Sequence, residues 1–378
     1  MREGWEARAL GEVAGLQIGR TPPRKETAYW TDDLLMPFCT IADMTGRQVK
    51  PSREGVTAAA VESGKAREVK AGTLLMSFKL TIGRVGFASV DLFPNEAIVA
   101  ISPDRAFTSS EYLYLYLGSQ DLSEGSSRAV KGSTLNSKSL ASISVLLPPL
   151  HEQRRIVDLV QSVDAYIDAL RALADAARTA RSSLLHDLLT VGGEDWSESP
   201  LGELADFRPG KYLKKTEYEN GGPFMVFGSN SIMGSHVDYL FDGPVIVMAG
   251  IGANAGAVRF SSEPCWINNN AFAIIAGESV RSEFLCFWLD TLLDLGLVRL
   301  GTGQPYIQKE ILKSVMLPVP PLMEQDRVLE LIRSIDDVLR ATESAIEAGN
   351  GLRSALLSDL LSGDHEIPES YDTLLEAS

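Results

Sequence analysis

Two long stretches of the chain place apolar residues at a seven-residue repeat, the pattern of a helix that packs on a second helix. From Glu152 to Leu189 the apolar positions alternate in steps of four and three, and the stretch from Glu324 to Leu361 follows the same steps. Such a repeat is typical of coiled coils and predicts two helices with a shared apolar seam. We expect helix–helix packing at Ile156, Val160, Val163, Ile167, Leu170, Val328, Ile332, Ile335, Leu339 and Ile346.

The two helical stretches are copies of one another, 172 residues apart. PPLHEQ from Pro148 recurs as PPLMEQ from Pro320, and RSSLLHDLL from Arg181 recurs as RSALLSDLL from Arg353. Proline before each helix and a glutamate in its first turn suit a helix N-terminus. Arginine occupies the same seam position in both copies, Arg181 and Arg353, and we expect it to end the tight packing there.

The second helical stretch contains two glycines, Gly349 and Gly351. Each is about 1 kcal/mol less favourable than alanine inside a helix. The sequence therefore predicts a break or kink at this point.

The order of segments predicts the direction of the helices. A helix of about 38 residues is roughly 57 Å long, which is more than a small domain needs for its own core. The chain enters a second end domain after the first helix and leaves it before the second helix. Because domain termini often lie close together, the helices should run antiparallel.

We therefore predict an α+β protein with a pseudo-two-fold internal repeat, in which two mixed α/β domains are separated by a long antiparallel two-helix coiled coil. The expected segments are an end domain at 1–150, a helix at 151–192, an end domain at 193–320, a helix at 321–363 and an acidic tail at 364–378. A plain antiparallel coiled coil with attached segments is the alternative.

The end domains carry alternating signals for strands and helices. Apolar runs of strand length, bounded by Gly, Pro or Asn, occur in both domains. Stretches with a candidate N-cap serine at or next to their first residue, followed by helical periodicity, also occur in both. The expected strands are Thr73–Phe78, Ala97–Ile101, Pro244–Gly250 and Phe272–Ala276, and the expected helices are Ser109–Ser119 and Arg281–Gly296.

Composition bounds the location and the class of partner. The chain has 378 residues, of which 45% are hydrophobic, and no apolar run reaches the roughly 18 residues that a membrane span needs. Its start lacks the apolar stretch of a secretory signal, so we expect a cytoplasmic protein with no membrane partner. The net charge of -15 for the whole chain argues against a nucleic-acid partner. The acidity is uneven, however, because residues 321–378 hold 13 acidic groups and only 4 basic ones.

The sequence gives little indication of a disulfide, a metal site, a cofactor site or a catalytic site. Cys39, Cys265 and Cys286 are widely spaced, which favours buried free thiols over disulfides or a metal site. The four histidines occur singly, and no catalytic motif is present. Gly250, Gly252 and Gly256 have the spacing GxGxxxG, which differs from a dinucleotide loop. We therefore expect hairpin turns or loops that let the backbone approach a partner, and no cofactor or metal in this chain.

Basic clusters and polar loops nominate residues for DNA contact. Lysine and arginine suit phosphates or guanine edges, whereas asparagine and glutamine suit adenine. The segments KGSTLN and GTGQPY precede the last apolar run of each end domain and are rich in small, polar and amide residues. The candidates are Arg20, Lys79, Arg84, Lys131, Thr134, Asn136, Lys211, Lys214, Asn254, Gln304 and Tyr306.

These features resemble the specificity subunit of type I restriction-modification systems. The resemblance rests on the doubled PPLxEQ helix ending in RSxLLxDLL, on LGE at the start of each half, and on IGRVG and GTGQP within dissimilar domains. It implies two target-recognition domains that read a split double-stranded DNA sequence. It also implies a non-catalytic chain that docks two modification subunits, which bind S-adenosylmethionine, and through them the restriction subunits.

Two other functions remain open. A scaffold that binds only protein through its end domains would fit the low net charge. A self-sufficient enzyme is disfavoured because methyltransferase and nuclease motifs are absent.

Overall fold

The computed structural model describes residues 4–51, 53–122, 127–129, 132–190, 193, 195–218, 221–229, 231–301, 303–365, 367–368 and 370–375. The chain forms two compact units. Unit 1 consists of Met1–Ala169 and Ile346–Ser378, and unit 2 is Leu170–Ala345. Each unit thus contains one end domain and a part of each long helix.

Unit 1 contains the strands and short helices that precede the first long helix, and one short helix that follows the second long helix. The strands are β1 (Glu6–Ala9), β2 (Ala14–Ile18), β3 (Trp30–Thr31), β4 (Phe38–Cys39), β5 (Gln48–Val49), β6 (Gly55–Val56), β7 (Leu74–Ser77), β8 (Lys79–Leu80), β9 (Val85–Ala88), β10 (Phe93–Pro94), β11 (Ile98–Pro103), β12 (Ser127–Ala129), β13 (Gly132–Thr134) and β14 (Ser144–Leu147). The helices are α1 (Leu10–Val13), α2 (Ala58–Glu62), α3 (Ser110–Ser119), α4 (Ser137–Ala141) and α12 (Ser370–Leu375), with 3-10 turns at Thr27–Tyr29 and Ile41–Asp43.

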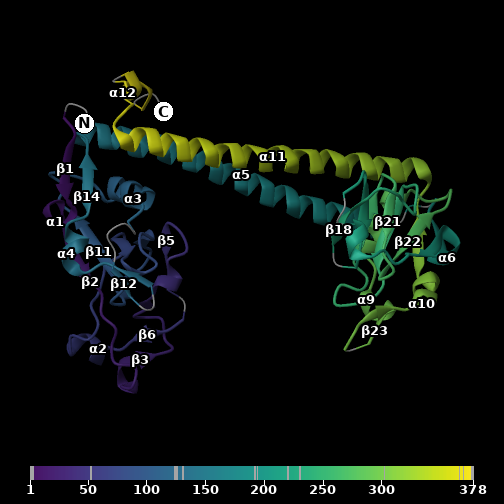
Figure 1. Ribbon diagram of the computed structural model, residues 1–378, viewed down its shortest axis with the longest axis horizontal. Coiled ribbons are helices and arrows are strands. Elements are labelled where there is room, and N and C mark those ends of the chain that lie inside the picture. Colours follow the sequence, from purple (N-terminus) through teal and green to yellow (C-terminus); the bar gives the residue numbers. More distant parts are fainter. Residues whose placement is uncertain are drawn as a thin grey trace. The chain divides into compact units, whose positions relative to one another are not determined.

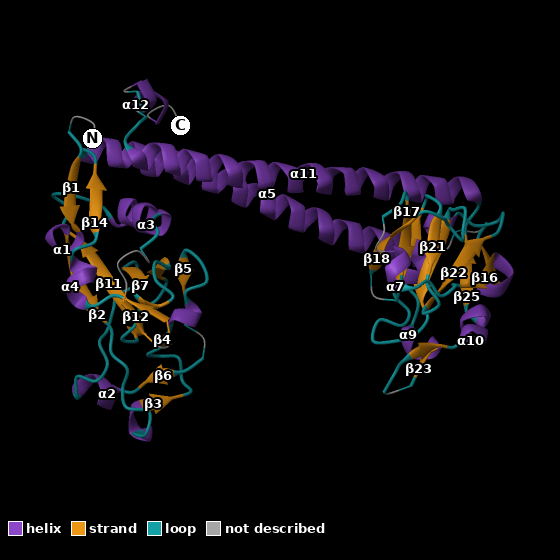
Figure 2. Cartoon of the chain, viewed as in Figure 1, coloured by secondary structure: helices purple, strands orange, loops and turns teal. Residues whose placement is uncertain are grey.

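The core of unit 1 is a five-stranded mixed sheet in the order β2-β11-β7-β9-β5 (Figure 2). Successive side chains of a strand point to opposite faces. Accordingly, Leu74 and Met76 of β7 enter one apolar cluster, and Leu75 enters another. The sheet is therefore covered on both faces.

Unit 2 repeats this plan with different lengths. Its strands are β15 (Ser197–Pro200), β16 (Ala205–Pro209), β17 (Phe224–Phe227), β18 (Ile232–His236), β19 (Val245–Ala249), β20 (Val258–Ser261), β21 (Cys265–Ile267), β22 (Ala271–Ala276), β23 (Arg299–Leu300), β24 (Tyr306–Ile307) and β25 (Met316–Val319). Its helices are α6 (Leu201–Leu204), α7 (Lys215–Tyr218), α8 (Ser282–Thr291), α9 (Leu295–Val298) and α10 (Lys309–Ser314). The central sheet has the order β16-β22-β19-β20, which matches β2-β11-β7-β9 of unit 1.

One helix boundary differs from the expectation. The stretch predicted as one helix over Arg281–Gly296 forms α8, which ends at Thr291, followed by the short α9. The N-cap of α8 is Arg281 rather than a serine. Its backbone N–H donates to Gln325 and its guanidinium pairs with Asp326, so residues distant in sequence hold this helix start.

The long helices are α5 (Leu150–Thr190) and α11 (Leu322–Ser362) (Figure 1). Within unit 1, Asp164 pairs with Arg353 and Ile167 lies against Gly349, so the helices run antiparallel. Within unit 2, Arg181 of α5 pairs with Asp336 of α11, which fits the same antiparallel arrangement. The predicted fold class, two mixed α/β domains with an antiparallel two-helix coiled coil, is confirmed.

The predicted seam positions lie between these helices. Ile156, Val160, Ile167, Val328 and Ile332 are buried. The remaining five, Val163, Leu170, Ile335, Leu339 and Ile346, are half-buried.

The expectation that Arg181 and Arg353 end the tight packing is wrong. Each makes an ion pair with an aspartate of the other helix, and the two pairs are related by the internal repeat. Beyond them Leu185 shares an apolar cluster with Val328 and Ile332 of the other helix, and Leu357 shares one with Ile156 and Val160, so both helices contribute to apolar packing past the arginines. A charged seam position is accommodated here because its partner satisfies it within the helix pair.

The expectation of a break at Gly349 and Gly351 is also wrong, since α11 is continuous through both. A Cβ on Gly349 would lie 3.0 Å from Ile167 Cγ1, whereas a Cβ on Gly351 would meet nothing within 4 Å. Gly349 is thus buried against Ile167 of the facing helix, and this packing compensates for its low helix propensity. Only tertiary contact distinguishes the two glycines.

This difference gives a paired prediction. Gly351→Ala should raise the free energy of unfolding by about 1 kcal/mol through helix propensity alone. Gly349→Leu should lower it by about 2 kcal/mol, because the added side chain must push the helices apart. Urea denaturation of the two variants measures both effects. Equal shifts of the same sign would contradict the close approach at Gly349.

The PPLxEQ motif ties each end domain to its helix in the same way. In unit 1, Trp5 Nε1 donates to Glu152 at 3.2 Å, and the buried Gln153 Nε2 donates to the carbonyls of Pro148 at 2.9 Å and Phe107 at 2.8 Å. In unit 2, Trp196 donates to Glu324 at 3.0 Å, and Gln325 donates to the carbonyls of Pro320 and Ser279. The chain repeats this motif because the same joint is built twice.

The three cysteines are buried free thiols, and burial raises the pKa of Cys39 and of Cys286 to about 12. None of the described helices is long and apolar enough to cross a membrane. The described parts of the chain contain no group of three or more His, Cys, Asp or Glu side chains that could hold a metal ion.

Candidate nucleic-acid interface

In unit 1 two strands of the central sheet end at the same edge. β2 and β7 both pair antiparallel with β11, which lies between them, so they run in the same direction. The residues that follow them keep this pairing, since Gly19 N–H donates to Ile98 O at 3.0 Å and Phe78 N–H donates to Ala97 O at 2.9 Å. Arg20 and Lys79 come next in the chain, so both lie at the end of the sheet where β2 and β7 finish. We name this end the β2–β7 edge.

Backbone pairing adds a second element to the β2–β7 edge. β8 pairs antiparallel with β13, with Lys79 opposite Thr134 and Leu80 opposite Ser133, and β13 pairs with β12. Leu135 N–H donates to Phe78 O at 3.0 Å. The chain thus brings the KGSTLN segment beside the loop that contains Lys79 and Arg84, although more than 40 residues separate them in sequence.

Unit 2 builds the equivalent edge. β16 and β19 flank β22 and end together, with Lys211 N–H donating to Ile267 O at 2.9 Å and Gly250 N–H donating to Asn270 O at 2.9 Å. The loop after β19 pairs with the GTGQPY segment, because Gly252 N–H donates to Pro305 O at 2.7 Å and Ile307 N–H donates to Gly250 O. We name this the β16–β19 edge. β23 pairs with β24, whose Tyr306 forms a bridge with Ile251 of the loop after β19.

The glycine-rich loop between β19 and β20 is a hairpin connection, as predicted. Gly252 and Gly256 have φ of +102° and +98°, values that glycine adopts readily. A dinucleotide loop leads into a helix whose N-terminus holds the pyrophosphate, whereas this loop leads into a strand. The loop therefore lacks that anion site and instead presents Asn254, which is exposed.

The predicted contact residues of unit 1 are placed unequally. Arg20 is exposed and donates to Gly64 O at 2.6 Å, and Arg84 donates to Ile41 O at 3.4 Å. Asn136 is the N-cap of α4, and its Oδ1 accepts from the backbone of Lys138 and Ser139, so this oxygen is engaged within the protein. Lys131 lies outside the described residues, and the structure describes Thr134 only by its backbone in β13.

The predicted residues of unit 2 gather at the β16–β19 edge. Lys211 and Lys214 are exposed after β16. Gln304 is exposed, and Tyr306 is 45% exposed opposite Ile251. Charged, amide and aromatic side chains therefore meet on one edge.

The ion pairs show which basic side chains are already neutralised within the protein. Arg24, in the same sequence cluster as Arg20, pairs with both oxygens of Glu54 at 2.6 and 2.8 Å and lies 3.7 Å over the Trp30 ring. Among the described residues no carboxylate pairs with Arg20, Lys79, Arg84, Lys211 or Lys214. Counterion release needs cations that are not already paired, so these five nominated side chains can take part in it.

Sequence reasoning missed three features of the two edges. Tyr212, beside Lys211, is 65% exposed, and Leu80, with a φ of +66°, is 62% exposed. The aromatic within GKYLKK could have been noticed, whereas nothing in the sequence marks the backbone of Leu80. Arg299 donates to Ala253 O at 2.8 Å and so holds the β19–β20 loop.

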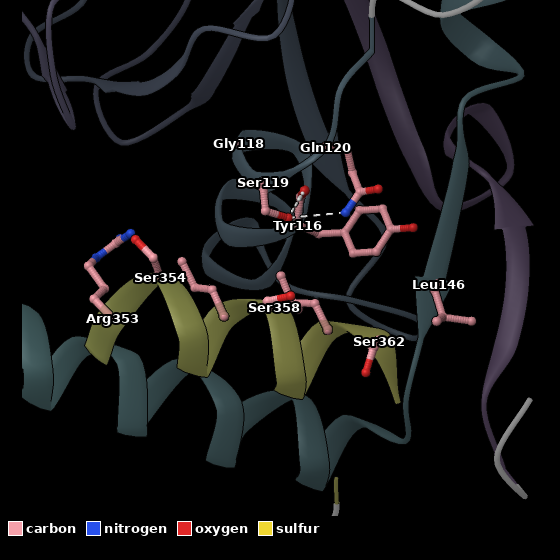
Figure 3. A pocket seen from close by; sticks show the side chains of 11 residues that line it. Tyr116, Gly118, Ser119, Gln120, Leu146, Arg353, Ser354, Ser358 and Ser362 are labelled. Atoms are coloured by element: carbon pink, nitrogen blue, oxygen red, sulfur yellow. Dashed lines mark hydrogen bonds between the residues drawn. The ribbon is translucent and has the colours of Figure 1, made fainter. Parts of the chain in front are cut away.

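A cavity of about 640 Å³ in unit 1 lies elsewhere. Figure 3 shows Arg353, Ser354 and Ser358 of α11 facing Ser119 and Gln120 at the end of α3. Its lining contains no residue of the β2–β7 edge. It belongs to the joint between domain and helix rather than to the candidate interface.

Comparisons with known proteins agree with this architecture. A family model described as the type I restriction modification DNA specificity domain matches residues 2–176 and 193–348. The type I restriction enzyme MjaIX specificity subunit of Methanocaldococcus jannaschii is 28% identical over 405 residues, covering 95% of this chain and 92% of that protein. The MjaVIII specificity subunit of the same organism is 25% identical over 270 residues, and the match spans 64% of that protein, less than two thirds of its length.

Solved structures share the fold. The type I restriction-modification S subunit from M. genitalium superposes with a TM-score of 0.58 at 17% identity, over 94% of this chain and 96% of that one. A chain from a structure described as the basis of complex assembly and conformational transition of the type I R-M system gives 0.66 at 18% identity, over 97% and 99%. The match of both halves to one family model and the duplicated fold lead to one conclusion: the chain belongs to the family of type I restriction-modification specificity subunits.

Proposed function

We propose that each unit reads one part of a two-part, asymmetric DNA sequence through its sheet edge. The observation that carries this proposal is that the β2–β7 and β16–β19 edges have the same backbone construction but different side chains. Equivalent scaffolds with unlike surfaces suit the reading of two unlike half-sites. Unpaired lysines and arginines would supply attraction to phosphates, and amides and Tyr306 would contact base edges.

The long helices have a separate role in this proposal. They set the distance between the two reading domains, and their acidic outer faces dock two modification subunits rather than DNA. Methyl transfer from S-adenosylmethionine and cleavage would then belong to the modification and restriction subunits, and this chain would contribute sequence choice alone. The names of the relatives, which are specificity subunits of type I restriction enzymes, support this division.

The test is DNA binding by the purified full chain at a series of salt concentrations. We expect Lys211→Ala to weaken binding to all duplexes alike and to reduce the slope of log affinity against log salt by about 1. Gln304→Ala should instead relax the preference at one base position, at about 1–3 kcal/mol. Gel shift with specific and random duplexes measures both.

The matched control is Lys313→Ala. This lysine also lies in unit 2 but pairs with Glu310 and lies near Asp206 at the start of β16, which is the opposite end of the strand. It should leave affinity and slope unchanged. Affinity that depends on neither salt nor Lys211 would favour the alternative, a scaffold whose end domains bind only protein. Methyl transfer by the chain alone would contradict the non-catalytic role.

A further inference from the structure

The β2–β7 edge carries a leucine in a backbone conformation that residues with a side chain rarely adopt. Leu80 has a φ of +66°, and among the described residues it is the only one other than glycine with a positive φ. The N–H of Thr81 donates to Lys79 O at 2.8 Å, so Leu80 is the central residue of a three-residue γ-turn. With a positive φ at its centre, this turn is the rare and strained form.

Contacts on both sides of Leu80 hold the turn in place. Ser77 is fully buried, and its hydroxyl donates to Thr81 O at 2.5 Å and accepts from the N–H of Arg84 at 3.1 Å. On the other side β8 pairs with β13, so that Leu80 lies opposite Ser133. Strained residues persist where the surrounding structure fixes them in this way, and such residues are concentrated at functional sites.

The equivalent position of unit 2 is a glycine. The carbonyl of Phe78 accepts a backbone hydrogen bond from the KGSTLN segment, and the carbonyl of Gly250 accepts one from β24, so these two residues correspond. Two positions later unit 1 has Leu80 and unit 2 has Gly252, whose φ is +102°. Glycine adopts a positive φ without strain, so unit 2 has the residue that the backbone favours here. The leucine of unit 1 is therefore explained by its side chain and not by the backbone.

The side chain of Leu80 contributes little to the core of unit 1. It is 62% exposed, whereas Phe78 is 1% exposed and belongs to the main apolar cluster. The neighbours of Leu80 in the turn are polar, with Lys79 half-buried and Thr81 exposed. An aliphatic side chain thus lies exposed among the polar groups of the candidate interface.

We propose that Leu80 is a specificity-determining residue that recognises a thymine through contact with its 5-methyl group. This inference rests on the proposed function of the β2–β7 edge and adds a residue and a base to it. In the major groove the base edges present hydrogen-bond donors and acceptors, and the thymine methyl is the apolar group among them. An aliphatic side chain has no polar atom, so the methyl is the group that it matches. The turn fixes the backbone of Leu80 before DNA binds, which lowers the entropic cost of the contact.

The first test is the selection of bound duplexes from a library of random sequence, with the full wild-type chain and with Leu80→Gly. The wild type should select a thymine, on either strand, at one position of one half-site, and Leu80→Gly should lose this preference alone. Glycine suits the positive φ, so Leu80→Gly should not unfold at a lower temperature than the wild type. Leu80→Asn, which also tolerates this φ, should lose the same preference, and Leu80→Met should keep it.

A second test removes the methyl group instead of the side chain. In a selected duplex each thymine is replaced in turn by uracil, which lacks only the 5-methyl group. One replacement should weaken wild-type binding about fourfold, the effect of burying one methyl group, and should leave the binding of Leu80→Gly unchanged. The matched control is Leu35→Gly, because Leu35 is 86% exposed in unit 1 and lies outside the β2–β7 edge. This control should respond to uracil as the wild type does.

Three outcomes would overturn the proposal. The first is a set of selected sequences that Leu80→Gly leaves unchanged. The second is wild-type binding that no uracil replacement weakens. The third is a loss of affinity in Leu80→Gly that is equal for thymine and uracil duplexes and is accompanied by reduced DNA bending, because leucine would then be a wedge between base pairs. In all three cases the chain still binds DNA in a salt-dependent way, whereas a chain that binds no duplex would contradict the proposed function itself.

Discussion

Replacing Gln153 with leucine is expected to lower the free energy of unfolding by about 3 kcal/mol, because three buried polar groups lose their partner at once. Gln153 is 2% exposed. Its amide donates to the carbonyls of Phe107 and Pro148, and its Oε1 accepts from Thr108 Oγ1 at 2.9 Å. Leucine fills the same volume but leaves these groups buried without hydrogen bonds.

The internal repeat supplies a second instance of this prediction. Gln325 is fully buried and makes the same kind of contacts, with Arg281 N–H donating to its Oε1 at 2.7 Å. Gln325→Leu should therefore cost about as much as Gln153→Leu. Hydrogen exchange should become faster at amides of unit 1 in Gln153→Leu and at amides of unit 2 in Gln325→Leu.

The control for this pair is Gln161→Leu on the same helix as Gln153. Gln161 is half-buried and makes one long hydrogen bond of 3.4 Å to Glu111, so its replacement should change stability by less than about 0.5 kcal/mol. Urea denaturation compares the three variants. A Gln153→Leu protein as stable as the control would contradict the role of the glutamine as the joint between domain and helix.

Replacing Gly210 with alanine is expected to destabilise unit 2 by about 3 kcal/mol and to remove DNA binding through the β16–β19 edge. A Cβ at this position would lie 2.2 Å from the backbone oxygen of Asn268 and 2.6 Å from that of Ile267. Neither atom can rotate away, so the end of β16 and the following Lys211 must shift. Gly19 has the same relation to Pro94 O, also at 2.2 Å, and Gly19→Ala should act likewise at the β2–β7 edge.

Gly303→Ala is the matched control at the same edge. A Cβ there meets nothing within 4 Å. Stability should therefore be unchanged, or rise slightly because alanine reduces the conformational entropy of the unfolded chain. Thermal unfolding and gel shift measure the two consequences separately. A Gly210→Ala protein with wild-type stability and unaltered affinity would refute the close approach and its effect on the edge.

Much of the scaffold was predictable because its signals are periodic or repeated. The seven-residue pattern of positions such as Ile156 and Val160 specifies a buried stripe, and a helix that carries one needs a partner. The duplication of the PPLxEQ segments supplied that partner, and the connection through an end domain indicated its direction. The strands around Leu74 and Val245 were visible because buried strands are short apolar runs bounded by turn residues.

The two sheet edges were predictable only in part. Lys211 and Tyr306 were nominated for their chemistry, but their placement at one edge depends on two backbone pairings that the sequence does not show. Lys211 N–H pairs with Ile267 O, and Gly252 N–H pairs with Pro305 O. The availability of a cation was equally hidden, since Arg20 and Arg24 look alike in sequence. A carboxylate 30 residues further on, Glu54, neutralises only the second of them.

The sequence by itself determined the repeat, the two helices with their antiparallel sense, and the mixed α/β class, because local periodicity and copy number are properties of the chain. Tertiary structure alone decided which glycine of α11 packs against the facing helix and which arginines are paired. These depend on contacts between residues far apart in the chain, whose energies no local pattern encodes.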